Sequence, residues 1–295
     1  MADYHYIDFF VNLVLAIIMF GLGLSLTLND FKNIFINPRS IITCLIVQLF
    51  VIPLIAFTIA FLSGLSPEVK VGIVLVSVCA SGASSNLITH LVKGNVALAI
   101  SMTAANSFIT LITLPFAVSV AIRFFLGTES HIQLPVMQTI LQIFAVTILP
   151  ASLGLYVRRL SHQFAQRMEK PLNIALPLLL GLVFTFKIFG GTDQGGTGIS
   201  FPEALRIFPF VFLLNMLAMT TGFFIARYMR LVYRDQYTLA IEVGLHNTAL
   251  ALLVAGSILH SSDMEKPALV YAAFTFFSAF LFAYLVKGKN LFKAP

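Results

Sequence analysis

Long apolar stretches, separated by short polar segments, dominate the pattern of this chain. Each stretch is close to the ~20 residues that a helix needs to cross ~30 Å of hydrocarbon. Membrane-spanning strands would alternate apolar and polar residues, and these stretches do not. The pattern therefore predicts an all-α integral membrane protein with nine transmembrane helices. The predicted spans are residues 7–28, 40–62, 70–91, 96–122, 134–157, 172–189, 204–226, 237–259 and 268–287.

Composition supports a protein whose main solvent is not water. Of the 295 residues, 59% are hydrophobic and 10% are charged, whereas charged residues make up ~25% of an ordinary soluble domain. The net charge of +6 comes from basic residues in short loops, a distribution that argues against nucleic-acid binding. Cys44 and Cys79 lie inside apolar spans, where we expect packing residues. The N-terminal residues 1–8 are acidic, and we expect no removable signal peptide.

The distribution of Lys and Arg predicts how the chain is oriented. If the N-terminus lies outside, the inner loops and the C-terminal tail hold 13 of the 18 basic residues. Positive charge favours the cytoplasmic side. We expect a multi-pass protein of the plasma (inner) membrane, with the N-terminus outside and the C-terminus in the cytoplasm. Lys187 and Arg123 fall at span ends, from which long side chains can reach the interface.

Two spans carry the most concentrated small and polar residues. The third reads VCASGASSNLITHL and the eighth reads IEVGLHNTALALL. These two spans run in opposite directions, as the halves of an inverted repeat would, and broken helices at matching places are typical of transporter binding sites. We predict one integral membrane domain, residues 1–295. Its first repeat, 7–126, lacks one helix, and its second repeat covers 134–288.

Glu242 is the only acid inside a predicted span. An ionisable side chain at membrane depth costs ~3 kcal/mol or more without a partner. No Lys or Arg falls at a matching depth, so a bound Na⁺ or H⁺ is the natural partner. The other reading is a protonated Glu that is hydrogen-bonded to a neighbouring helix.

The polar stretches also offer backbone groups. Gly244 weakens the eighth span, and Asn247 and Thr248 can cap a new helix. Carbonyls before such a break suit a hard cation, and the N–H groups after it suit an anion. The same applies to residues 81–86, although close packing of small residues also explains that stretch. Gln48, Thr103 and Asn106 add buried polar groups, each of which could equally form an interhelical hydrogen bond.

Several longer motifs resemble the bile acid:sodium symporter family. They are FGLGLSLTLNDF at residues 20–31, Gln48 with the following VIP, ASGASSNLITHLVKGNVALAISMT at 80–103 and IEVGLHNTALA at 241–251. The resemblance implies crossing broken helices in a core domain beside a panel domain. The panel helices would be 7–28, 134–157 and 172–189. The core helices would be 40–62, 70–91, 96–122, 204–226, 237–259 and 268–287.

The resemblance also implies site residues. One Na⁺ site would use Ser85, Asn86, Thr103 and Glu242. A second would use Gln48, Glu242, backbone oxygens near Val243 and Leu245, and His246. The substrate, an organic anion, would lie near Ala83, Ser84, Asn247 and Asn215.

Two departures from the family pattern bear on ion coupling. Ala99 stands where the family usually has a serine, and His246 stands where it usually has a glutamine. The sequence therefore allows one or two Na⁺ ions per transport cycle, or a proton in place of one Na⁺.

The sequence thus predicts a transporter rather than an enzyme. We expect sodium-coupled symport of an organic anion, a bile acid or a smaller carboxylate, by alternating access, with no obligatory protein partner. A proton-coupled or uncoupled anion transporter or channel is an alternative. A remote alternative is an intramembrane serine protease that pairs a serine of residues 81–85 with His246, but it leaves Glu242 unexplained.

Overall fold

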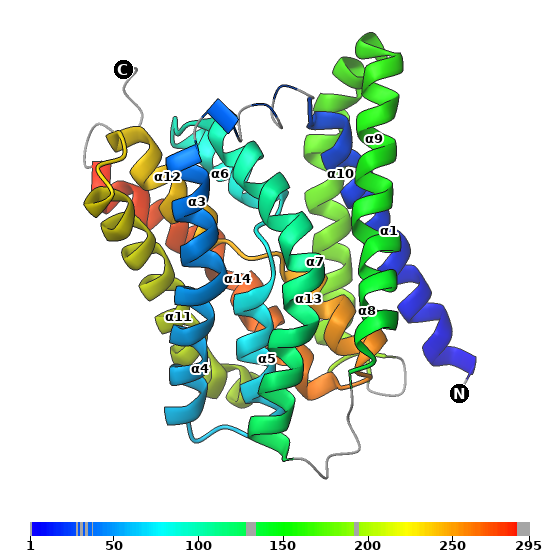
Figure 1. Cartoon of the computed structure of the whole chain (residues 1–295). Helices are drawn as coiled ribbons and strands as arrows, with labels where there is room; N and C mark the ends of the chain where they lie inside the picture. Colours follow the sequence, from blue (N-terminus) through cyan, green and yellow to red (C-terminus); the bar gives the residue numbers. More distant parts are fainter. Residues whose placement is uncertain are drawn as a thin grey trace.

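A computed structural model describes residues 2–27, 29, 32, 35–36, 38–127, 134–191 and 195–287. Within these ranges the secondary structure is helical, apart from one isolated bridge between residues 81 and 246. The helices run nearly in parallel or antiparallel through one body (Figure 1). They are α1 (Ala2–Ser25), α3 (Pro38–Ile46), the π-helical turn η1 (Val47–Val51), α4 (Ile52–Leu62), α5 (Pro67–Val78), α6 (Ala83–Leu91), α7 (Val96–Leu126), α8 (Val136–Ile143), η2 (Phe144–Ile148), α9 (Leu149–Leu160), α10 (His162–Phe189), α11 (Phe201–Tyr228), α12 (Tyr233–Gly244), α13 (Thr248–Leu252), η4 (Leu253–Ile258) and α14 (Ser262–Lys287).

Helix occupies every range in which a span is predicted, which confirms the all-α fold class. Five continuous helical segments are long and apolar enough to cross a membrane, and three shorter apolar helices lie in the predicted first, sixth and eighth spans. The helices of the sixth and ninth predicted spans, α10 and α14, begin earlier than predicted, at His162 and Ser262. Their first turns contain polar residues, so the apolar pattern does not reveal them. Residues 28 and 288, at predicted boundaries, lie outside the described residues.

The helices form two groups (Figure 1). Helix α1 packs against α9 and α10 at one side, and α3–α7 pack with α11–α14 at the other. The two groups meet where α7 contacts α8 and where α1 contacts η4. The body has two opposite ends. The C-terminal face, where α14 ends, lies at the top of Figure 1, and the N-terminal face, where α1 begins, lies below it.

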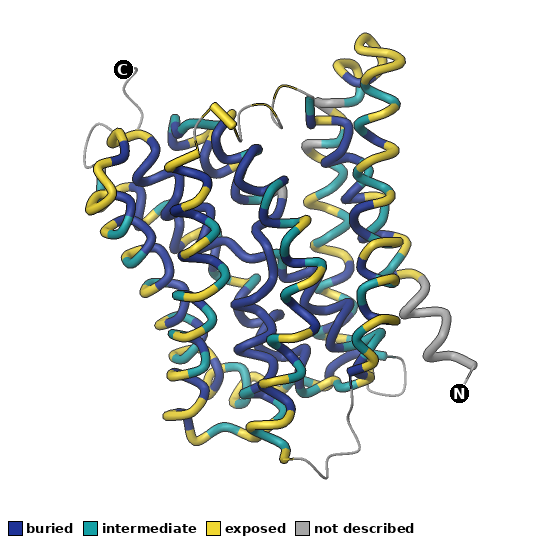
Figure 2. Tube along the Cα trace, in the orientation of Figure 1, coloured by how far each residue is buried: buried dark blue, intermediate teal, exposed yellow. Residues whose placement is uncertain are grey.

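Burial follows a membrane pattern rather than a soluble one. Buried residues fill the middle of the body, while residues on the outer surfaces of the peripheral helices are exposed (Figure 2). Many of the exposed side chains are large and apolar, among them Phe50, Leu54 and Phe116. An exposed apolar surface of this extent is stable only against another apolar phase. The arrangement therefore fits a bilayer around the helices.

Two of the spans are broken in the middle. Helix α5 stops at Val78 and α6 starts at Ala83; likewise, α12 stops at Gly244 and α13 starts at Thr248. Each break lies within the polar stretch that predicts it. The middle of α5 packs closely against α14: a Cβ on Gly72 would lie 2.5 Å from the Met264 carbonyl. Glycine is thus needed there for the close approach.

Candidate functional site

The two breaks cross each other in the interior. Ser81 and His246 form an antiparallel bridge, and the Asn247 N–H donates to the Ala80 carbonyl at 2.7 Å. Backbone that leaves a helix must find new partners when it is buried. Each break supplies partners for the other, so the crossing holds both interruptions in place.

Side chains take up carbonyls that the breaks release. The Gln48 amide, in η1, donates to the carbonyls of Ser77 and Cys79 at 3.0 and 3.2 Å. At the other break, Asn215 and Tyr271 both donate to the Gly244 carbonyl, at 2.7 and 2.6 Å. These side chains fix the last turns of α5 and α12.

Glu242 is completely buried beside the crossing. Its Oε1 accepts hydrogen bonds from the Ser81 hydroxyl and from the Thr103 hydroxyl, the latter at 2.6 Å. Its Oε2 has no partner among the described residues. Asn86 Oδ1 lies 3.4 Å from the Thr103 hydroxyl. Ser81 was missed as a site residue in the sequence, although it stands inside the polar stretch that marks the break.

Ser85 belongs to the same neighbourhood but is engaged locally. Its hydroxyl is buried and donates to the Gly82 carbonyl at 2.8 Å. Three of the four residues predicted for the first cation site thus lie together: the Thr103 hydroxyl is within hydrogen-bonding distance of both Glu242 and Asn86. The buried Ala99 offers no side-chain oxygen.

Gln48 and His246 meet on the other side of the crossing. His246 Nδ1 lies 3.2 Å from the Cys79 carbonyl and 3.4 Å from the Gln48 amide nitrogen. Only a protonated Nδ1 can bond a carbonyl, so we assign the hydrogen to Nδ1 and the lone pair to Nε2. His246 Nε2 and Gln48 Oε1 are buried without a partner in the described part of the chain. Val243 and Leu245, which lie between Glu242 and His246 in the sequence, are buried as well.

The unpartnered atoms of Gln48, Glu242 and His246 share one chemical property. Gln48 Oε1, Glu242 Oε2 and, in this tautomer, His246 Nε2 are all acceptors. Buried acceptors without donors are costly, and a cation removes that cost. The described residues contain no group of three or more His, Cys, Asp or Glu suited to a metal such as zinc. Oxygen-rich ligation with one carboxylate suits a hard cation of low charge.

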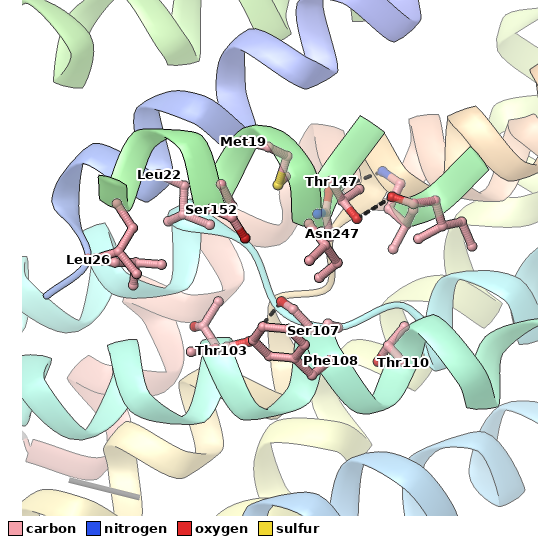
Figure 3. A pocket seen from close by; sticks show the side chains of 17 residues that line it. Met19, Leu22, Leu26, Thr103, Ser107, Phe108, Thr110, Thr147, Ser152 and Asn247 are labelled. Atoms are coloured by element: carbon pink, nitrogen blue, oxygen red, sulfur yellow. Dashed lines mark hydrogen bonds between the residues drawn. The ribbon is translucent and has the colours of Figure 1, made fainter. Parts of the chain in front are cut away.

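A cavity of about 60 Å³ lies next to the crossing. Figure 3 shows its walls: Met19 and Leu22 come from α1, Thr103 and Thr110 from α7, and Asn247 from the second break. Asn247 caps α13, and its Oδ1 accepts from the Leu250 N–H at 3.1 Å. The cavity therefore touches both the candidate cation site and the start of a half-helix.

The other predicted substrate residues are placed differently. Asn215 is fully buried behind the second break, where its amide bonds the Gly244 carbonyl, Tyr271 and Ser278. It does not line the cavity, and neither does Ser84. Helix α6 begins at Ala83, whose side chain lies outside the described part of the structure.

Lys187 corrects one expectation. The sequence predicts that it extends to the interface, but its side chain is 4% exposed and forms an ion pair with Glu265 at 2.7 Å. The reason is that α14 begins six residues before its predicted span and brings Glu265 against α10. A second pair, Lys266 with Glu203, lies at the same end of the molecule.

The fold and the site together define a class of protein. Broken helices that cross at mid-depth, with a buried carboxylate and free helix ends at the crossing, are typical of secondary transporters. The comparisons with known proteins narrow this class. Residues 12–193 match the sodium bile acid symporter family, and the chain belongs to that family.

Relatives support the assignment. The chain is 31% identical over 252 residues to an uncharacterized sodium-dependent transporter, YocS, of Bacillus subtilis, over 85% of this chain and 74% of the relative. It is 27% identical over 242 residues to a probable chloroplast sodium/metabolite cotransporter, BASS1, of Arabidopsis thaliana, over 82% of this chain and 57% of that relative. It is 24% identical over 293 residues to the ileal sodium/bile acid cotransporter of Cricetulus griseus, over 95% and 81% of the two chains. The family consists of sodium-dependent transporters, not enzymes.

Proposed function

We propose that this protein couples the inward flow of Na⁺ to the uptake of a small organic anion. The observation that carries the proposal is Glu242, which is fully buried and hydrogen-bonded through Oε1 while its Oε2 lacks a partner in the described structure. A carboxylate in this state is stabilised by a cation at its free oxygen. Thr103, Asn86 and the nearby Ser85 are the further oxygen donors of the first site.

The second site is proposed around Gln48 Oε1, His246 and the backbone near Val243 and Leu245. His246 offers a ring nitrogen where an amide oxygen would be a better Na⁺ ligand, and it can take a proton. With Ala99 beside the first site, the ion count is one or two, and a proton in place of one Na⁺ is the alternative. The slope of uptake against Na⁺, measured between pH 5 and 8, distinguishes these cases. A slope near two that does not vary with pH excludes the proton.

The proposed movement is alternating access, in which α1 and α8–α10 act as the panel and the remaining helices as the core. Two polar contacts tie these groups near the N-terminal face: Lys187 to Glu265 at 2.7 Å, and Ser257 to Asn12 at 3.2 Å. Toward the C-terminal face, the groups are separated by a second cavity of about 230 Å³ between α1, α10 and α6–α7. This supports a state that is closed at the N-terminal face, which our topology places outside, and open toward the cytoplasm.

The proposed substrate position is the cavity beside Asn247. None of the described residues that line it is charged, so the Asn247 side-chain amide and the positive N-terminal end of α13 would hold the anionic group. The names of the relatives point to bile acids or metabolites, and we propose an organic anion of this range. A bile acid is larger than the 60 Å³ cavity, so the core must move to admit one.

Uptake into sealed vesicles tests the proposal. Labelled taurocholate and a series of labelled small carboxylates are supplied with and without an inward Na⁺ gradient. Accumulation above equilibrium that requires the gradient is the expected result for at least one anion. Equilibration without accumulation indicates a channel, and accumulation driven only by a pH gradient indicates proton coupling; either result refutes sodium symport.

A further inference from the structure

A hollow of about 280 Å³ lies at the C-terminal face, between the end of α1, the end of α9 and the start of α10. Its polar lining consists of Arg158, Arg159, His162, Asn29 and Thr27. Each of these side chains can donate hydrogen bonds, and none of the lining residues that the structure describes is acidic. The site is separate from the crossing and has no part in the proposed ion binding.

Arg158 is held in place within this hollow. Its Nη1 donates to the Leu24 carbonyl, in the last turn of α1, at 2.7 Å. A free carbonyl at a helix end repels anions, and this hydrogen bond satisfies one carbonyl in the last turn of α1. Arg159 and His162 are exposed at the rim, and His162 Nε2 lies 3.0 Å from the Gln166 amide nitrogen. The hollow thus combines one guanidinium that is held by a backbone carbonyl with two exposed side chains around an open space.

The hollow also adjoins the proposed substrate cavity. Leu26 and Leu155 form part of both walls. These two leucines therefore stand between the cavity beside Asn247 and the arginines. The interior cavity lacks a charged lining, whereas this end has two arginines within it.

We propose that Arg158, Arg159 and His162 form an oxyanion-binding site for a carboxylate or phosphate group. Arginine side chains bind such groups with paired, charge-assisted hydrogen bonds. Two sources supply this chemistry: a soluble anion at the mouth of the cavity, and the phosphate of an anionic lipid headgroup. A general excess of positive charge on the cytoplasmic side is the competing explanation, and it predicts no preference for this hollow.

A pair of arginine variants distinguishes a built site from general charge. Arg159→Gln removes a charge from the hollow, and Arg230→Gln removes one from an exposed position at the same face that lines none of the described cavities. The purified full-length protein is studied without Na⁺, so the outcome does not depend on ion coupling. One arm titrates inorganic phosphate and acetate in neutral detergent and measures the melting temperature. The other arm counts phosphatidylglycerol molecules retained by the protein from mixed phosphatidylcholine nanodiscs by native mass spectrometry.

The expected result is binding in at least one arm that Arg159→Gln weakens tenfold or more and Arg230→Gln leaves within twofold of wild type. Response in the first arm assigns a soluble anion, and response in the second alone assigns a lipid headgroup; both support the site. Equal loss in the two variants shows general charge attraction and overturns the proposal, as does the absence of binding in both arms. Sodium-driven uptake is measured separately, so a failure here leaves the symport proposal standing.

Discussion

Replacement of Glu242 by glutamine tests the central feature of the site. The variant keeps an acceptor oxygen for the hydroxyls of Ser81 and Thr103, which both bond Oε1. It removes the negative charge and replaces the unpartnered Oε2 with an amide NH₂ group. In the absence of Na⁺, a buried carboxylate without a counter-charge is costly. We therefore expect Glu242→Gln to unfold at the same temperature as wild type, or at a higher one, when no Na⁺ is present.

The effect on Na⁺ binding follows from electrostatics. Two unit charges 4 Å apart attract by ~4 kcal/mol at an effective dielectric constant of 20, which corresponds to about a thousandfold in the dissociation constant. At a Na⁺ concentration one hundred times the wild-type dissociation constant, binding stabilises wild type by ~2.7 kcal/mol. The same concentration stabilises the variant by less than ~0.1 kcal/mol.

The assay is a melting curve of purified protein at increasing NaCl, with choline chloride to hold ionic strength constant. Wild type should gain stability with Na⁺, and Glu242→Gln should not. Glu203→Gln is the matched control, because this acid is partly exposed at the N-terminal face and paired with Lys266. The reasoning is refuted if Glu242→Gln responds to Na⁺ as wild type does, or if Glu203→Gln loses the response equally.

Three further changes test the packing and the crossing. Gly72→Ala should destabilise the protein by ~1–3 kcal/mol, because the new Cβ meets a backbone carbonyl of α14. Gly181→Ala is the control: a Cβ there has nothing within 4 Å, so this variant should be neutral or stabilising. Unfolding in denaturant measures both. Lys187→Met should cost ~3–5 kcal/mol because it removes the cation that pairs with the buried Glu265 carboxylate. Adding Glu265→Gln should recover most of this loss, and a double variant no more stable than the single one would contradict it. Asn247→Ala should lose ~1 kcal/mol of capping and lower anion uptake more than the melting temperature; normal uptake would remove this residue from the substrate site.

The hydrophobic pattern predicted where the helices lie, and the polar stretches predicted where two of them break. Span length is set by the thickness of hydrocarbon, and a cluster of glycine, serine and asparagine weakens any helix regardless of its surroundings. Glu242 could be singled out for the same reason: burial of an acid in an apolar span is costly wherever the span packs. The polar stretches and the motifs around them also carried the family resemblance.

Pairing across the chain required the tertiary structure. Ser81 and Glu242 are 161 positions apart, and nothing in either local sequence states that the first break lies against the second. The tautomer of His246 depends on the Cys79 carbonyl, which only the crossing brings within 3.2 Å. Lys187 was misplaced because its partner, Glu265, reaches it through helix packing. Local sequence determines which polar groups are buried and hence the free energy needed to remove them from water. The packing of distant helices determines which partner stabilises each of these groups.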